Sequence, residues 1–154
     1  MNADFVNPFI ISLLNVLETM AQIKLQVGKP KRKTTALAQG DVSGLIGMVG
    51  DNIKGSMSIT FEEGLALDIM QGMLGERPDT LDAEVSDMVG EITNMICGNA
   101  KRELGERGYE FAMATPVVVS GHRHSISHQV DGPKIILPFN SDTGLAHLEI
   151  CFDK

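Results

Sequence analysis

The sequence has few of the features that mark a secreted, membrane-bound or nucleic-acid-binding protein. Its 154 residues include two cysteines, no tryptophan and one tyrosine, and its net charge is −7. Two cysteines are too few for the disulfide framework of a small secreted domain, so Cys97 and Cys151 are predicted to be reduced thiols. The acidic balance disfavours nucleic acid and anionic membrane as partners, because both attract basic surfaces.

Long apolar runs and targeting segments are also missing. The most apolar stretch, residues 9–14, is too short to cross a bilayer. No basic run precedes it, as a signal peptide would require. We therefore expect a cytoplasmic protein. A hydrophobic content of 43% over 154 residues suits one domain, residues 1–154, with a core of its own.

The first half of the chain predicts one helix and two strands. Apolar residues at spacings of three and four predict a helix over residues 8–23, with Pro8 at its first position. The basic cluster at 28–33 is predicted to be a solvated turn. Strands are predicted at 45–49 and 53–61. In the second strand, residues that are apolar or glycine alternate strictly with polar residues, which predicts one buried face and one face exposed to solvent.

The second half predicts two helices and then strands. The helices are expected at 62–74 and 79–104, with Gly75 and Gly105 as their stops. Pro138 predicts a strand at a sheet edge or a strand end. This order of elements predicts an α+β fold. The strands are expected at 116–120, 126–130, 134–139 and 145–152, with a hairpin turn at Asp131-Gly132.

The helix predicted at 79–104 carries an unusual polar face. Glu91 and Asn94 are three residues apart, so they are neighbours about one turn from each other. Asparagine and glycine are poor helix formers, yet Asn94, Gly90 and Gly98 lie together on this helix. Two interpretations remain open: a solvated helix face, or a patch that another protein approaches closely. The full face is Asp87, Glu91, Asn94, Gly98 and Lys101.

The motif Glu91-Ile92-Thr93-Asn94 resembles the signature helix of the CheC/CheX/FliY phosphatases. Ser86 before it and residues 98–101 after it fit the same pattern. Residues 115–121 and 137–139 are similar to CheX rather than CheC. The resemblance implies a CheC-like fold, in which long helices pack on one face of a mainly antiparallel sheet and a helix-then-strands arrangement occurs twice.

The resemblance also implies an activity: removal of phosphate from the aspartyl-phosphate of a CheY-like receiver in chemotaxis or two-component signalling. Asn94 would orient the attacking water, and Glu91 would engage a lysine of the receiver. Further contacts to the partner would come from Asp87, Gly90, Gly98 and Lys101. The chain itself would need no cofactor or metal, since Mg²⁺ is expected on the receiver.

Four further expectations concern assembly, the number of sites, an alternative function and a group of histidines. The resemblance implies a homodimer formed through sheet edges. It also implies one site per chain, because residues 18–21 place Ala21 where a second site would need asparagine. The alternative function is a receiver-binding or scaffold module without turnover. A metal site is the less favoured interpretation of a histidine group that lacks accompanying cysteines or carboxylates, namely His122, His124, His128 and His147.

Overall fold

The computed structural model describes residues 3–33, 38–51, 53–121, 124–126, 128 and 132–153. Within them the chain forms three helices: α1 (Ala3–Ala21), α2 (Glu63–Leu74) and α3 (Ala83–Glu106). It also forms eight strands: β1 (Gln26–Val27), β2 (Lys31–Arg32), β3 (Val42–Val49), β4 (Lys54–Phe61), β5 (Ala112–Met113), β6 (Val117–Ser120), β7 (Lys134–Asn140) and β8 (Leu145–Asp153).

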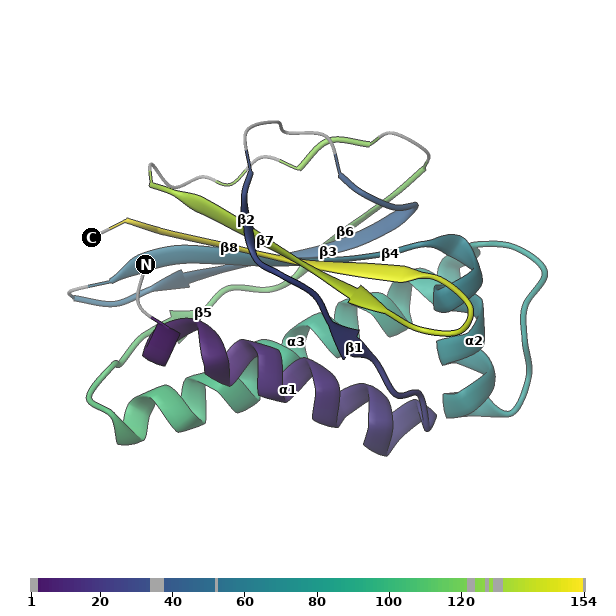
Figure 1. Ribbon diagram of the computed structural model, residues 1–154, viewed down its shortest axis with the longest axis horizontal. Coiled ribbons are helices and arrows are strands. Elements are labelled where there is room, and N and C mark those ends of the chain that lie inside the picture. The colour runs from purple at the N-terminus through teal and green to yellow at the C-terminus, as the bar shows by residue number, and fades with distance from the viewer. Residues whose placement is uncertain are drawn as a thin grey trace.

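The strands make one sheet in which every described pairing is antiparallel. The order is β1-β7-β8-β4-β3-β5, with β2 also on β7 and β6 also on β3. The helices lie on one face of this sheet, with α1 and α3 side by side (Figure 1). The predicted α+β architecture is therefore confirmed, and strands follow helices twice along the chain.

The core lies between the helices and the inner face of the sheet. Phe9, Leu13 and Leu17 of α1 are fully buried there, as alternate residues of β4 and β8 are. Ser12 joins the two long helices, because its Oγ donates to the carbonyl oxygen of Ile96 at 3.0 Å. This layer is the support on which α3 is held.

The predicted start of the first helix is wrong, because α1 begins at Ala3 and contains Pro8. A proline inside a helix has no N–H for the carbonyl four residues before it. Here that carbonyl belongs to Asp4, and Arg107 Nη1 donates to it at 3.1 Å. A side chain distant in sequence thus compensates for the missing bond, and the helix extends beyond the proline.

Both ends of α3 differ from the sequence-based prediction. The helix begins at Ala83, since Asp82 serves as its N-cap and accepts from the Val85 N–H at 3.0 Å. It continues through Gly105 to Glu106. The glycine in a left-handed conformation is Gly108, at φ 93°. The stop predicted for α2 is confirmed, because Gly75 has φ 84° and closes the helix through its N–H.

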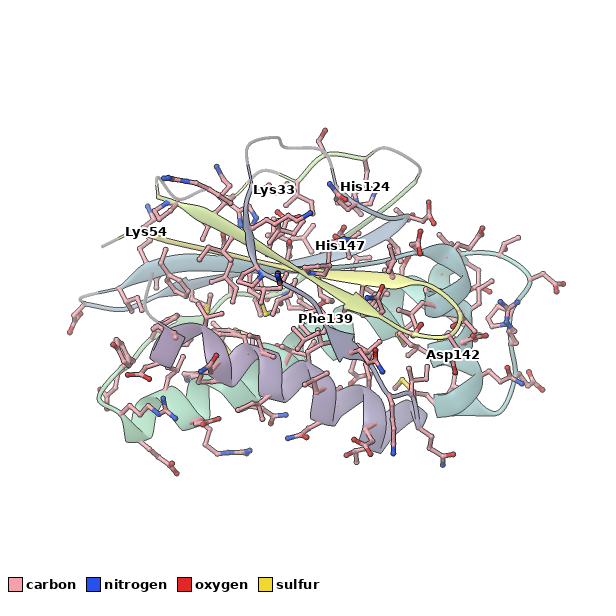
Figure 2. The ribbon with its side chains drawn as sticks, in the orientation of Figure 1. Lys33, Lys54, His124, Phe139, Asp142 and His147 are labelled. Atoms are coloured by element: carbon pink, nitrogen blue, oxygen red, sulfur yellow. The ribbon has the colours of Figure 1, made fainter. Side chains whose placement is uncertain are left out.

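The outer face of the sheet is buried, which the alternation in β4 does not predict. Ser56, Ser58 and Thr60 are 4%, 0% and 0% exposed. Figure 2 shows Lys33 and His124 on the side of the sheet opposite the helices. His124 Nε2 lies 2.6 Å from the Ser43 hydroxyl, and Ser43 in turn lies 2.5 Å from Thr60 Oγ1. Segments beside β2 and after β6 therefore cover a face that was expected to be wet.

The basic cluster at 28–33 is not simply a solvated turn. Lys31 and Arg32 form β2, which pairs with β7. Lys33 Nζ lies 2.6 Å from Glu149 Oε2, and their side chains are 3% and 0% exposed. This buried ion pair fastens the segment before residue 34 to the outer face of β8.

The C-terminal strands agree with the prediction apart from one. Pro138 lies in β7, whose outer neighbours are the two short strands β1 and β2. Its carbonyl accepts from the Gly28 N–H at 2.7 Å, but proline returns no donor, so this ladder is interrupted. Ile126 is buried and not in a strand. Most of the strand predicted at 126–130, and Asp131 of the predicted turn, lie outside the described residues. No helix within the described part of the chain has the length and apolar character of a membrane span.

Candidate functional site

The polar face predicted on α3 points outward in the structure. Asp87, Glu91, Asn94 and Lys101 are exposed, and Gly98 is half-buried. The opposite stripe of α3 is buried against the sheet and α1: Val85, Met88, Val89, Ile92 and Ile96. The carboxylate of Glu91 and the amide of Asn94 are therefore presented to solvent, one helical turn apart.

The turn that carries these two residues lies unusually close to β3. Thr93 is fully buried beneath Asn94, and its hydroxyl donates to the Val89 carbonyl at 2.6 Å. The facing residue on β3 is Gly44, where an added Cβ would overlap Thr93 Oγ1 and stand 3.0 Å from Thr93 Cβ. Only glycine at residue 44 permits this approach, so Gly44 and Thr93 fix the height of the site above the sheet.

The two glycines predicted to contact the partner, Gly90 and Gly98, have different surroundings. An added Cβ at Gly90 would meet Val118 Cγ2 of β6 at 3.3 Å, a tight contact. An added Cβ at Gly98 would meet nothing within 4 Å. Gly90 therefore lets β6 pack against the site-bearing turn. Gly98 serves no packing contact of the described chain, although glycine inside a helix costs about 1 kcal/mol against alanine.

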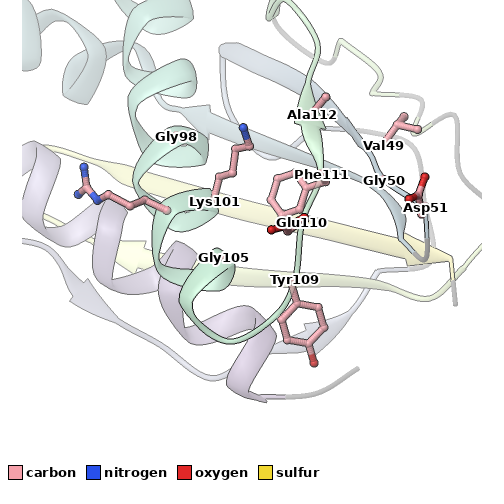
Figure 3. A pocket seen from close by; sticks show the side chains of 11 residues that line it. Val49, Gly50, Asp51, Gly98, Lys101, Gly105, Tyr109, Glu110, Phe111 and Ala112 are labelled. Atoms are coloured by element: carbon pink, nitrogen blue, oxygen red, sulfur yellow. The ribbon is translucent and has the colours of Figure 1, made fainter.

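A shallow groove of about 790 Å³ begins at Gly98 and runs beside the C-terminal half of α3. Lys101 and Gly105 line it from α3, and Tyr109 and Glu110 line it from the segment after the helix (Figure 3). Its far end reaches Asp51 in the turn between β3 and β4. The groove is thus continuous with the face that carries Glu91 and Asn94.

Cys97 lies on the same helix but is excluded as a nucleophile by its surroundings. Its side chain is fully buried. Burial raises the pKa of the thiol to about 12, which outweighs the opposite influence of Lys101. A nucleophilic cysteine requires the thiolate form at neutral pH, so this thiol is part of the core.

A family model described as "Chemotaxis phosphatase CheX" matches residues 42–140. The chain belongs to the CheX family. The match includes the whole of β3, β4, α2 and α3, and therefore every residue of the candidate face.

Solved structures agree with this family over the full length of the chain. A chemotaxis protein CheX from Vibrio vulnificus is 63% identical, with a TM-score of 0.93, over 98% of this chain and 100% of that one. A CheC-like superfamily protein from Shewanella sp. PV-4 is 62% identical, with a TM-score of 0.95, and each chain is covered completely. No relative was found among curated proteins.

One CheX structure includes a partner. A CheX–CheY complex from Borrelia burgdorferi, with BeF₃ and Mg²⁺, contains a chain 26% identical to this one. The match has a TM-score of 0.83 and covers 99% of this chain and 100% of that one.

A second site of the same kind cannot be formed by residues 18–21. Glu18 is exposed in the last turn of α1, whereas Ala21 is only 4% exposed. Ala21 belongs to the core cluster, and its backbone packs so closely on α2 that an added Cβ at Gly72 would overlap it. Even an asparagine at residue 21 would be buried in the core. The first helix therefore cannot present a second exposed pair like Glu91 and Asn94.

The histidine group does not converge on one point in the described part of the chain. His124 contacts Ser43, and His128 lies between Ser56 and Glu149, with its Nε2 3.2 Å from Glu149 Oε1. Among the described residues no three histidine, cysteine, aspartate or glutamate side chains come together as metal ligands. His122 lies outside the described residues.

Sequence reasoning found the outward face of α3 but missed what surrounds it. Gly44 and the wall from Tyr109 to Ala112 come from segments distant in sequence from Glu91. Gly44 carried a signal, because glycine inside a strand often marks a close backbone approach. The groove carried none, since it depends on how the chain after α3 returns to pair with β3.

Proposed function

We propose that this chain is a protein aspartyl-phosphate phosphatase that acts on a CheY-like receiver. The observation that carries the proposal is the exposed pair Glu91 and Asn94, one turn apart on α3, in a chain of the CheX family. The Borrelia complex of a CheX with CheY, BeF₃ and Mg²⁺ supports the choice of partner. Mg²⁺ belongs to the receiver in this proposal, and no cofactor is required on this chain.

The residue types suit the reaction. Phosphoryl transfer passes through a loose transition state and depends on positioning and charge stabilisation more than on strong base catalysis. The Asn94 amide both donates and accepts hydrogen bonds and has no charge, so it orients a water without adding negative charge beside the phosphoryl group. Glu91 binds the receiver lysine through a charge-assisted hydrogen bond and sets the register of docking.

The support beneath the pair also suits this role. Positioning contributes several kcal/mol to catalysis only when the geometry is held closely. Asn94 follows Thr93, which is buried and packs tightly against Gly44. In the preceding turn, Gly90 packs against Val118. Asn94 therefore enters the receiver site on a backbone that is already fixed before docking.

The test is phosphate release from CheY-like receivers phosphorylated with acetyl phosphate. Asn94→Ala is expected to lower kcat by about 10²–10³ and to retain receiver binding. Asn94→Asp is expected to lose activity as well, since the carboxylate repels the phosphoryl group. Asn99→Ala is the matched control, because Asn99 lies on the same helix and contacts only Arg102 among the hydrogen bonds found. Wild-type activity in Asn94→Ala would overturn the assigned mechanism.

The same assay separates the enzyme from a scaffold. A receiver-binding module would bind the phosphorylated receiver with no phosphate release above the receiver's own rate. Release of many phosphates per molecule of this chain, added at substoichiometric amounts, would identify it as a phosphatase. Retention of both Glu91 and Asn94 on the exposed face supports turnover over binding alone.

The proposal includes a homodimer through a sheet edge and a cytoplasmic location, where receivers act. β6 is a short edge strand, and Val117 and Val119 on it are 59% and 40% exposed. Among the described residues no strand pairs with the outer edge of β6, and exposed apolar residues on such an edge favour strand addition by a second copy. Sedimentation equilibrium tests this point: Val119→Lys is expected to shift the protein towards monomer, and an unchanged mass would exclude the β6 edge.

A further inference from the structure

The groove beside α3 has features that the folding of this chain does not explain. An added Cβ at Gly105, like one at Gly98, would meet nothing within 4 Å. Gly98 lies in the interior of α3, where glycine costs about 1 kcal/mol relative to alanine, and Gly105 is the penultimate residue of the helix. Both also line the groove. Both residues therefore leave the α3 side of the groove open, and at Gly98 this lowers helix stability.

The opposite wall of the groove is held by contacts with other parts of the fold. Tyr109 packs edge-on against Phe5 of α1, with ring centroids 5.1 Å apart. Residues 112–113 pair with β3 as β5. The turn after β3 is held at the same place, because the Gly50 N–H donates to the Ile53 carbonyl at 2.7 Å. A partner therefore meets a groove whose shape is already set.

The charges in the groove are not used within the chain. Lys101, Glu110 and Asp51 are exposed, and none of the ion pairs found among the described residues includes them. Two cationic residues, Lys101 and Arg102, stand on the α3 side, and two carboxylates stand on the far side. A complementary partner therefore places an acidic group over Lys101 and a basic group towards Glu110 and Asp51.

The groove lies within reach of any protein docked on Asn94. At 1.5 Å per residue, Gly98 is about 6 Å and Gly105 about 16 Å along α3 from Asn94. A typical interface covers about 800 Å² on each partner, which is a disc of about 16 Å radius. A receiver centred on Asn94 therefore covers the end of the groove at Gly98 and Lys101 and reaches about as far as Gly105.

We propose that this groove is a specificity surface for the receiver, separate from the catalytic pair. It takes the part of the receiver next to its phosphoaspartate pocket, with an acidic side chain over Lys101 and a basic one at Glu110 and Asp51. The inference rests on the proposed phosphatase function. It assigns partner selection to Lys101, Gly105 and Glu110, which make no contact with the phosphoryl group.

The experiment uses the CheY-like receiver that the wild-type chain dephosphorylates fastest, phosphorylated with acetyl phosphate. Lys101→Glu and Glu110→Lys are each expected to raise KM about 3–10-fold at low salt, with a smaller effect at high salt and with kcat within about twofold. Lys24→Glu and Glu18→Lys are the matched controls. They make the same charge changes on exposed residues at or beyond the C-terminal end of α1, remote from the groove.

A steric series tests the same surface without charge. Gly105→Ala and Gly105→Leu replace glycine with better helix formers, so neither is expected to unfold the chain. KM should rise from glycine to alanine to leucine, and circular dichroism should show intact helices. The dissociation constant is measured in the Asn94→Ala background, where the phosphorylated receiver is not consumed during the titration.

The outcomes separate the two proposals. Weaker binding in the groove variants, with unchanged controls, supports the specificity surface. Unchanged KM and dissociation constant in Lys101→Glu, Glu110→Lys and Gly105→Leu would overturn it, while loss of turnover in Asn94→Ala would still support the phosphatase. An active Asn94→Ala would instead overturn the catalytic assignment.

Discussion

Gly44 of β3 and Thr93 of α3 pack so closely that a single methyl group at residue 44 would overlap the threonine hydroxyl. Thr93 immediately precedes Asn94, and its side chain is buried while that of Asn94 is exposed. The contact therefore sets both the distance of α3 from the sheet and the direction in which Asn94 projects. A residue without a side chain, on a different element, thereby determines the geometry of the exposed pair.

Gly44→Ala is expected to lower both stability and activity. Overpacking of this kind costs about 1–3 kcal/mol, and a displacement of about 1 Å in a positioned group lowers rates about 10²-fold. Urea denaturation and receiver dephosphorylation measure the two effects. Thr93→Ala in the same chain should restore part of both, since the remaining atom, Cβ, stands 3.0 Å from the added methyl.

Gly47→Ala is the control for this substitution. Gly47 lies on the same strand, but its added Cβ would meet only Ala114 Cβ at 3.8 Å, an ordinary contact. Loss of activity in Gly44→Ala but not in Gly47→Ala identifies the contact with α3 as the cause. Equal losses of activity in the two variants would show that the effect comes from replacing any glycine in β3, and not from the contact with Thr93.

Gly98→Ala is expected to stabilise the free protein. The added methyl meets nothing within 4 Å, so the gain in helix propensity of about 0.5–1 kcal/mol is not offset by a clash. Gly90→Ala is the comparison, because Val118 must move to accept its methyl group. The urea midpoint of unfolding should be higher in Gly98→Ala than in the wild type. In Gly90→Ala it should rise less or fall. A destabilised Gly98→Ala would show that the open space is filled in solution.

The buried pair Lys33–Glu149 should be costly to break from one side. Glu149→Gln leaves the Lys33 ammonium buried without its carboxylate, which typically costs about 3–5 kcal/mol. The double variant Lys33→Met with Glu149→Gln should lose less than the sum of the single changes, as a double-mutant cycle would show. Asp68→Asn removes a more exposed pair with Arg77 and should cost about 1 kcal/mol or less. If the double variant loses as much stability as the sum of the two single variants, Lys33 and Glu149 are not coupled.

Acid should weaken the fold in two steps. Burial lowers the pKa of His147 below its ordinary 6.5, so the unfolded chain binds a proton more readily than the folded one. Stability is therefore steady above about pH 6.5 and falls below it. Burial raises the pKa of Glu149, but hydrogen bonds from His128 and Lys33 outweigh this and leave it below 4.5. The contribution of Glu149 is present above about pH 4.5 and is lost as pH falls through the folded pKa.

Urea denaturation at pH 7, 6 and 5 tests the first of these steps. His147→Asn should reduce the loss of stability between pH 7 and pH 5, because the asparagine side chain does not bind a proton in this range. An equally steep decline in this variant would assign the acid sensitivity to other groups. The decline below pH 4.5 should remain, since Glu149 is retained.

Patterns along the chain predicted the elements well where local chemistry decides. Gly75 ends α2, and the alternation in the last strand places Ala146, Leu148 and Ile150 in the core. The pattern failed where a distant residue intervenes. Arg107 supports α1 around Pro8, and His128 contacts Ser56 on the outer face of β4, so neither result is visible in the local sequence.

The sequence alone determined that Glu91 and Asn94 share one face of a long amphipathic helix, because helical periodicity depends only on residue spacing. It also determined the family, through the motif in which they occur. Only the tertiary structure decided how high that helix stands above the sheet and what lies beside it. The contact of Gly44 with Thr93 and the wall from Tyr109 to Ala112 arise when chain segments far apart in sequence pack together, and no local pattern encodes such packing.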